Sequence, residues 1–365
     1  MGDVVRPDTA RIKSGDLKPG VYLYQAPSNS ERFWIDSIEQ LEGKFFKAVS
    51  GNSLFESDDL SSIAVAGDLL MVGRGVVRIL LSQRNRHNTI LVTEECDNLC
   101  QFCSQPPKET APLYGVAQRA LANYESAGVV GITGGEPTSR WAEFRSLLST
   151  QETWREGREL HVLSHGRNFR SHEKVRQLVS VPNAIERTLY GIPIHGHVSA
   201  LHDLLTRVPG SYEQTLDGAL NMAYVGAALE IRIVVNSKNS PYLSLIVESI
   251  ISKLRGSKFF IAVMQLEPVG WANNNFKHLF SPTKDHLAAL SESIALAEAA
   301  DIGLRLYNYP LCELSNDLRP YAVQSVSDWK NYFHEDCRAC NLKPECAGFF
   351  KSAARRGLIR VRPEL

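Results

Sequence analysis

Residues 89–103 read Thr-Ile-Leu-Val-Thr-Glu-Glu-Cys-Asp-Asn-Leu-Cys-Gln-Phe-Cys, a short apolar run followed directly by three closely spaced cysteines. The run over 89–93 has the length and the β-branched content of a buried strand. Cys96, Cys100 and Cys103 therefore lie on one tight loop at the end of a strand. In parallel α/β folds, ligands bind at the carboxyl ends of the strands, so this loop is the first candidate for a functional site.

Three thiolates do not close a metal site. On a four-iron cluster they leave one iron without a protein ligand, and an open iron can coordinate a substrate or a cofactor. Zinc is the alternative, but a closed structural zinc site takes four ligands. His87 is the only histidine close in sequence, and no fourth cysteine lies nearby. The spacing favours an iron-sulfur cluster that takes part in chemistry.

Beyond residue 88, short apolar strands alternate with amphipathic helices, which is typical of βαβ units and a parallel sheet. Apolar residues recur at helical spacing over 113–124 and 141–148. A last helix is expected over 287–300, before a strand at 303–307. The six earlier strands that we predict are Thr89–Thr93, Val129–Thr133, Leu160–Leu163, Ile185–Leu189, Leu229–Val235 and Phe259–Met264.

Both ends of the chain differ from this alternating pattern. The first 85 residues hold short β-like runs separated by Gly, Asn, Ser and Asp, and these predict a small β-rich domain. The last sixth is rich in Pro, Cys, Asn and Lys, which predicts a loop-rich extension. The predicted parts are 1–85, 86–305 and 306–365. The β-like runs are Val21–Tyr24, Phe33–Ile35, Phe45–Phe46 and Val76–Leu80.

Composition excludes several classes of function and location. Lys plus Arg equals Asp plus Glu at 40 each, so no overall field points to nucleic acid or to an anionic membrane. We find no signal peptide, and the apolar stretch 69–81 is interrupted by Arg74 and Arg78. Seven cysteines, an odd number, argue against a disulfide framework and for metal ligation in a reducing cytosol. We expect a cytoplasmic protein with no nucleic-acid and no membrane partner.

The second predicted strand ends in Thr133-Gly134-Gly135-Glu136-Pro137. Two glycines let backbone carbonyls approach a ligand because no Cβ intervenes, and Glu136 offers a carboxylate to an ammonium group. The alternative is a tight turn without further function. Adjacent parallel strands lie about 4.8 Å apart, so this edge can border the cysteine loop.

A second cysteine group lies near the C-terminus. Cys337, Cys340 and Cys346 fall in one short stretch, and Cys312 is the only remaining candidate for a fourth ligand. Four thiolates close a site completely. Zinc is an alternative to iron-sulfur here, because Cys-x2-Cys loops serve zinc equally well.

The spacing of Cys96, Cys100 and Cys103, with Phe102 before the last cysteine, resembles the cluster motif of the radical S-adenosylmethionine (SAM) superfamily. The Gly-Gly-Glu segment at 134–136 matches the segment that holds the methionine amino group of SAM in that superfamily. The resemblance implies an α/β fold with a partial (β/α)6 TIM-like barrel. It also implies that SAM is cleaved reductively to a 5'-deoxyadenosyl radical, which abstracts hydrogen from a substrate.

Further SAM contacts are implied by the same resemblance. Ser164-His165-Gly166 ends the third predicted strand, where many relatives have a Thr-Asn-Gly-like segment. Thr188, or else Tyr190, ends the fourth, where relatives often carry a polar ribose contact. Arg232 matches an arginine that contacts the SAM carboxylate in peptide-modifying relatives, although it suits a surface strand equally. No catalytic acid or base is identified. The implied SAM-binding residues are Gly134, Gly135, Glu136, Thr188 and Arg232.

The C-terminal cysteines resemble part of the auxiliary-cluster domain of peptide-modifying radical SAM enzymes. Phe350 stands where that domain has a further cysteine, so one auxiliary four-iron cluster fits and two do not.

Longer stretches resemble the C-type radical SAM maturases of the His-Xaa-Ser repeat system, over residues 85 to 352. They are His87-Asn88, Ser104–Pro107, Tyr307–Cys312 and Ser327–Lys330. In that family the enzyme is encoded beside a second radical SAM protein and a small peptide rich in His-Xaa-Ser repeats, the expected substrate. An electron donor is also implied.

Two other functions stay open. The same radical chemistry can act on a small molecule, which a barrel mouth too enclosed for a peptide would favour. An electron-transfer or scaffold protein would hold clusters without cleaving SAM. Such a protein is expected to use four thiolates at both sites, and it has no need of Gly134-Gly135-Glu136.

Overall fold

The structure is a computed structural model of the 365-residue chain. It divides into two compact units: residues 1–93, 111–133 and 140–161 form one, and residues 94–110, 134–139 and 162–365 form the other. The three-part division expected from the sequence stays a prediction. The structure describes residues 9–12, 14–15, 17, 20–24, 36–42, 45–48, 54–57, 59–73, 76–85, 87–154, 156–325 and 330–364.

The N-terminal part is β-rich. Its elements are β1 (Thr9–Arg11), β2 (Ser14–Gly15), β3 (Gly20–Tyr24), β4 (Asp36–Glu42), β5 (Phe45–Ala48), β6 (Leu54–Glu56), α1 (Leu60–Ile63), β7 (Leu69–Gly73) and β8 (Val76–Leu81). The eight strands form one sheet in the order β1-β8-β7-β3-β4-β5-β6-β2, in which β3 pairs antiparallel with β7 and parallel with β4. Tyr22, Tyr24, Leu60 and Leu70 lie in its core. Three of the four predicted β-like runs are strands, and Phe33–Ile35 lies outside the described residues.

The rest of the chain builds the α/β sheet that the sequence predicts. Its strands are β9 (Asn88–Leu91), β10 (Gly128–Thr133), β11 (Arg158–Leu163), β12 (Thr188–Pro193), β13 (Ala228–Val235), β14 (Phe259–Gln265), β15 (Gly303–Tyr307) and β16 (Ala322–Val323). They lie in the order β16-β15-β14-β13-β12-β11-β10-β9, and β12 to β16 pair in parallel in strict succession. The fold class, an open parallel sheet of the partial-barrel kind, is confirmed. β16 was not predicted, because two residues carry no periodic signal.

One strand prediction is wrong. We expected a strand over Ile185–Leu189, but β12 begins only at Thr188. Asn183 adopts a left-handed conformation with φ 62°, and its carbonyl accepts a hydrogen bond from the Arg187 peptide N–H (3.0 Å). The chain therefore turns through these residues, and apolar Ile185 does not begin the strand. Thr188 consequently opens β12 and does not end it.

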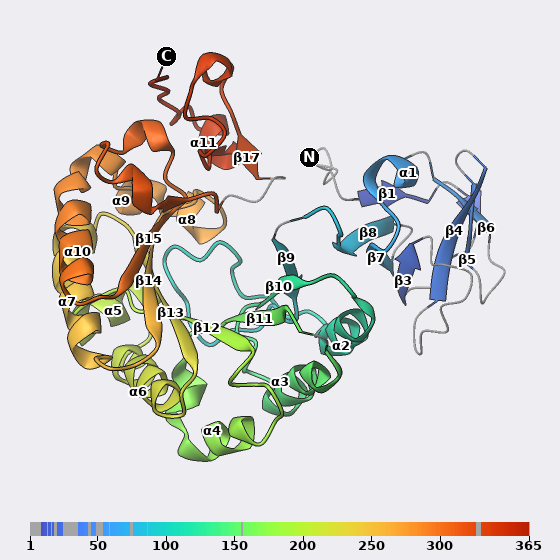
Figure 1. Ribbon diagram of the computed structural model, residues 1–365, viewed down its shortest axis with the longest axis horizontal. Helices are drawn as coiled ribbons and strands as arrows, with labels where there is room; N and C mark the ends of the chain where they lie inside the picture. Colours follow the sequence, from blue (N-terminus) through green and yellow to red (C-terminus); the bar gives the residue numbers. More distant parts are fainter. Residues whose placement is uncertain are drawn as a thin grey trace. The chain divides into compact units, whose positions relative to one another are not determined.

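Helices alternate with the strands as expected. The predicted helices correspond to α2 (Tyr114–Asn123), α3 (Trp141–Leu148) and α10 (Leu287–Ala299). In the second unit α6 (Ser211–Tyr224), α7 (Leu243–Lys253) and α10 lie along the outer side of β12–β15 (Figure 1). Their apolar residues face inward because burying one helical stripe on the sheet is the main source of stability in this arrangement. No helix in the described ranges is long and apolar enough to cross a membrane. The remaining short elements are α4 (His172–Val179), α5 (Ser199–Thr206), α8 (Trp271–Asn274), α9 (Phe276–Leu279), β17 (Asn331–Tyr332), β18 (Phe349–Phe350) and α11 (Lys351–Arg355).

Alternation along β13 separates two kinds of side chain. Leu229, Ile231 and Ile233 are fully buried on one face. Glu230 and Arg232 lie on the opposite face, because successive side chains of a strand point to opposite sides. The sheet thus carries a charged pair on the face opposite its apolar layer.

Candidate functional site

The loop with the first three cysteines is docked on the end of helix α5. The peptide N–H groups of Leu99 and Gln101 donate to the carbonyls of Thr206 (3.0 Å) and Leu205 (2.9 Å). The Gln101 side chain donates to the Leu204 carbonyl (2.7 Å). The last carbonyls of a helix have no partner within the helix, so the loop satisfies them and is held in return.

The segment after β14 holds the other side of the loop. The Trp271 peptide N–H donates to the Cys103 carbonyl (2.8 Å), and the Asn275 side chain donates to the Gln101 carbonyl (2.7 Å). Gly270 makes this approach possible: its φ is +58°, and a Cβ there would lie 2.5 Å from the Cys103 oxygen. Phe102 packs into an apolar cluster that includes Leu266. The loop is therefore fixed on both sides before any ligand binds.

The chemistry of Cys96, Cys100 and Cys103 fits an iron-sulfur cluster. Burial raises the pKa of Cys96 and of Cys100 to about 12, helped by Glu136 and Asp97 at Cys96 and by Cys103 at Cys100. Burial also raises the pKa of Cys103. The Asn98 peptide N–H also donates to the Cys96 sulfur (3.4 Å). Three soft sulfur donors in a desolvated place require a cation to become thiolates. Among the described residues, no three His, Cys, Asp or Glu side chains are already grouped as a metal site.

Gly135 brings the Gly-Gly-Glu segment against the cysteine loop. The Glu136 peptide N–H donates to the Glu95 carbonyl (2.6 Å), one residue before Cys96. A Cβ on Gly135 would lie 2.2 Å from that same oxygen, which no real Cβ tolerates. The sequence attributed this glycine to the approach of a ligand; the structure adds the approach of the cysteine loop itself.

The Glu136 carboxylate is fully buried and already occupied. Its Oε1 accepts from the Thr138 peptide N–H (2.8 Å), the Thr138 hydroxyl (2.5 Å) and the Ser164 hydroxyl (2.8 Å). Its Oε2 accepts from the His165 peptide N–H (2.7 Å). A carboxylate offers about four lone-pair positions, so little of this one is left for a ligand ammonium group.

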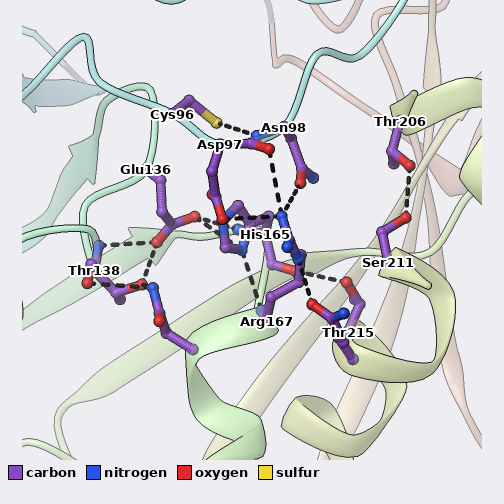
Figure 2. Close-up of polar contacts among 12 residues, drawn as sticks. Cys96, Asp97, Asn98, Glu136, Thr138, His165, Arg167, Thr206, Ser211 and Thr215 are labelled. Atoms are coloured by element: carbon purple, nitrogen blue, oxygen red, sulfur yellow. Dashed lines mark hydrogen bonds and ion pairs between the residues drawn. The ribbon is translucent and has the colours of Figure 1, made fainter. Parts of the chain in front are cut away.

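His165 links Glu136 to the cysteine loop, as Figure 2 shows. The Nε2 atom of His165 lies 2.7 Å from Asp97 Oδ1. Arg167 contacts the same segment, with Nη1 3.0 Å from Asp97 Oδ2 and 2.7 Å from Asn98 Oδ1. The hydrogen bond from His165, followed by the charge of Arg167, lowers the pKa of Asp97 to about 2 although burial opposes the shift. His165 was predicted to lie at this edge, whereas Asp97 and Arg167 were not predicted. The one sequence signal for them is an acidic residue between two cysteines.

Two buried histidines, His195 and His202, lie next to Phe102. The His195 ring meets the Phe102 ring edge-on at 4.7 Å and stacks on the His202 ring at 5.8 Å. Burial lowers the pKa of His195 well below its usual value and that of His202 to about 4. Both rings are therefore neutral at physiological pH, and they back the loop without adding charge.

The remaining predicted SAM contacts differ in position. Thr188 opens β12 and so lies at the strand end opposite to the one we predicted. Arg232 lies within β13, where Nη1 pairs with Glu230 (2.9 Å) and Nη2 contacts the Met264 sulfur (3.2 Å). Glu230 was not predicted; it is almost fully buried and holds the guanidinium on that face of the sheet.

The C-terminal cysteines come together. Cys312, Cys337, Cys340 and Cys346 line a single cavity together with Phe333, Leu342, Lys343, Phe349 and Val361. The Cys346 sulfur accepts from the peptide N–H groups of Leu311 (3.4 Å) and Gly348 (3.3 Å). Burial, and then the neighbouring cysteines, raises the pKa of Cys312 and Cys337. Four sulfur donors thus line a cavity whose other residues are mostly apolar, and a metal group bound there would have to draw these sulfurs closer together.

No known family profile and no curated protein matches the sequence. Streptococcus suis SuiB bound to S-adenosylmethionine matches with a TM-score of 0.46 and 17% identity, over 60% of this chain and 49% of that chain. SuiB is also known bound to its precursor peptide SuiA. The protein anSMEcpe with bound AdoMet matches with a TM-score of 0.47 and 14% identity, over 60% of this chain and 63% of that chain. HydG, a maturase of the FeFe-hydrogenase, matches with a TM-score of 0.48 and 13% identity, over 68% of this chain and 58% of that chain.

This chain spans about half the length of SuiB and less than two thirds of the other two.

Proposed function

We propose that this chain is a radical SAM enzyme whose cluster is held by Cys96, Cys100 and Cys103. The observation that carries the proposal is the direct contact between two motifs that lie apart in sequence. The Glu136 peptide N–H bonds to Glu95 beside Cys96, and Gly135 leaves room for that bond. A cysteine loop with one ligand too few thus borders a segment suited to an amino acid group.

The chain's own residues would bind and orient SAM. Gly134 and Gly135 present backbone to its amino group at this edge, and Arg232, oriented by Glu230, suits its carboxylate. Phe102 and the apolar residues behind it keep water from that side of the loop. A bound and reduced cluster supplies reductive cleavage of SAM and hydrogen-atom abstraction. Thr188 is not part of this proposal, because it opens its strand.

The four C-terminal cysteines would hold one auxiliary four-iron cluster. Their shared cavity and the two N–H bonds to Cys346 support a closed, four-thiolate site. Zinc is the competing occupant, since it takes the same ligands.

The substrate that we propose is a peptide with His-Xaa-Ser repeats, modified together with a second radical SAM maturase and an electron donor. This finer assignment is supported by the resemblance over 87–88, 104–107, 307–312 and 327–330.

The test is anaerobic reconstitution with iron and sulfide, reduction with dithionite, and measurement of 5'-deoxyadenosine from SAM by mass spectrometry. Wild type is expected to form deoxyadenosine, and Cys100→Ala is expected to form none. A fully loaded wild type that forms none, with and without peptide and partner, would overturn the proposal and favour an electron carrier.

A further inference from the structure

The Glu136 carboxylate lies at the sheet edge where we propose that SAM binds, but its hydrogen bonds are made within the protein. It is fully buried, and its strongest bonds go to groups of the chain itself: Thr138, Ser164 and the His165 peptide. A buried carboxyl group without hydrogen-bond partners is costly, and these donors satisfy its oxygens. The carboxylate therefore fixes the place of the His165 backbone.

The His165 ring carries that constraint to the cysteine loop. Its Nδ1 lies 3.1 Å from the Arg167 peptide nitrogen and 3.3 Å from Glu136 Oε2. A carboxylate only accepts hydrogen bonds, so the ring nitrogen that faces Asp97 carries a proton. Nε2 then donates to Asp97 Oδ1 (2.7 Å), which follows Cys96 directly. Glu136, His165 and Asp97 thus form a continuous chain of contacts from one motif to the other (Figure 2).

Helix α6 supports His165 from behind. The Thr215 hydroxyl donates to the His165 carbonyl (3.0 Å). Gly218 lets the helix approach closely, since a Cβ there would lie 2.1 Å from the Gly166 oxygen. Gly166 itself has φ +82°, a conformation that suits glycine. The ring is thus held from its backbone outward, and only its Nε2 atom reaches the loop.

We infer that, within the proposed function, His165 is a positioning residue that couples the Gly-Gly-Glu segment to the cysteine loop through its Nε2–Asp97 hydrogen bond. Glu136 then acts mainly through His165, by holding its backbone, and the bond to Asp97 keeps Cys96 and its neighbours in the geometry that receives the cluster.

Two substitutions separate the two ring nitrogens. In His165→Gln the amide nitrogen takes the place of Nε2, so the bond to Asp97 is kept. In His165→Asn the amide group takes the place of Nδ1, so the contact with Arg167 is kept and the bond to Asp97 is lost. Both variants are polar and neutral, which makes each the control of the other.

The measurement is the rate at which iodoacetamide alkylates Cys96, Cys100 and Cys103 in the iron-free, reduced full-length protein, located by peptide mass spectrometry. Loss of a hydrogen bond to a charged group is expected to accelerate alkylation about ten-fold in His165→Asn. The acceleration is expected to be at least as large in Asp97→Ala, which also loses the ion pair with Arg167. His165→Gln is expected to stay near wild type. Cys312 serves as the internal reference, and circular dichroism checks that each variant is folded.

The double variant His165→Asn/Asp97→Ala is expected to react no faster than Asp97→Ala alone, because Asp97→Ala already removes the bond from His165. Three results would each overturn the coupling. They are equal alkylation rates in His165→Gln and His165→Asn, a wild-type rate in His165→Asn, and additive effects in the double variant. None of these readouts needs a cluster or SAM. Failure of this inference is therefore distinguishable from failure of the proposed function, which only deoxyadenosine formation reports.

Discussion

The two cysteine groups of this chain are built differently. The first has three cysteines on a loop held by backbone bonds to α5 and by a polar network around Glu136 and His165. The second has four cysteines around a cavity whose other residues are mostly apolar. For the two clusters proposed above, a polar surround with three cysteines suits binding and turnover, whereas an apolar surround with four cysteines suits retention. The comparison predicts that the two sites respond differently to the same kind of change.

Removing one cysteine from each group tests this contrast most directly. Cys100→Ala is expected to abolish deoxyadenosine formation, because the open cluster loses a ligand. Cys340→Ala is expected to lower bound iron by about four atoms per chain while SAM cleavage in the absence of peptide continues. Iron and zinc analysis beside the deoxyadenosine assay measures both. Zinc in wild type that disappears in Cys340→Ala would assign the second site to zinc.

Gly135→Ala attacks the contact that joins the two motifs of the first site. Its Cβ would lie 2.2 Å from the Glu95 oxygen, so the loop must shift, at a cost of roughly 3 kcal/mol. We expect a lower free energy of unfolding and loss of SAM binding, measured by denaturation and by calorimetry of the reconstituted protein. Gly115→Ala is the matched control, because its Cβ would meet nothing closer than 3.6 Å. Unimpaired SAM binding in Gly135→Ala would contradict the contact.

Acid is expected to weaken the packing around His286, which contacts Tyr309 in the segment that precedes Cys312. His286 is buried and bonds to Ser281 (3.0 Å) and Tyr309 (3.2 Å), and burial lowers its pKa to about 4. The unfolded chain has a pKa near 6.5 at this position and binds the proton first. Stability is thus fully present above about pH 6.5 and is lost as the pH falls toward 4, by about 2 to 3 kcal/mol.

Urea unfolding between pH 4 and 7.5 measures the contribution of His286. His286→Gln, which does not titrate, is expected to show a flatter pH dependence over this window than wild type. An equally steep curve in the variant would assign the effect to other groups.

The smallest effect is expected on the charged face of β13. Arg232→Lys keeps the charge and the partner Glu230 but loses the planar fork that matches a carboxylate. We expect about a ten-fold weaker Kd for SAM, with unchanged iron content. Arg255→Lys, at a residue outside the site, is the control. A Kd equal to that of wild type would remove Arg232 from the binding site.

Much of the fold was predictable because strands and helices leave periodic patterns in sequence. Six predicted strands and the one at 303–307 all occur, with one displaced. The displaced strand failed because an apolar residue at 185 lies in a turn, which periodicity cannot distinguish from the start of a strand. Because of that error, we predicted Thr188 at the carboxyl end of its strand, whereas it is the first residue of β12.

The sequence by itself determined the local patterns: the spacing within each short cysteine stretch is set by a few residues of chain, as is the Gly-Gly-Glu turn. Only the tertiary structure decided the rest. His165 and Asp97 are 68 residues apart in the chain, and Leu311 and Cys346 are 35 apart. Whether a carboxylate stays open or becomes saturated, and whether four cysteines share one cavity, depends on which distant donors folding brings together, and local sequence carries no record of that.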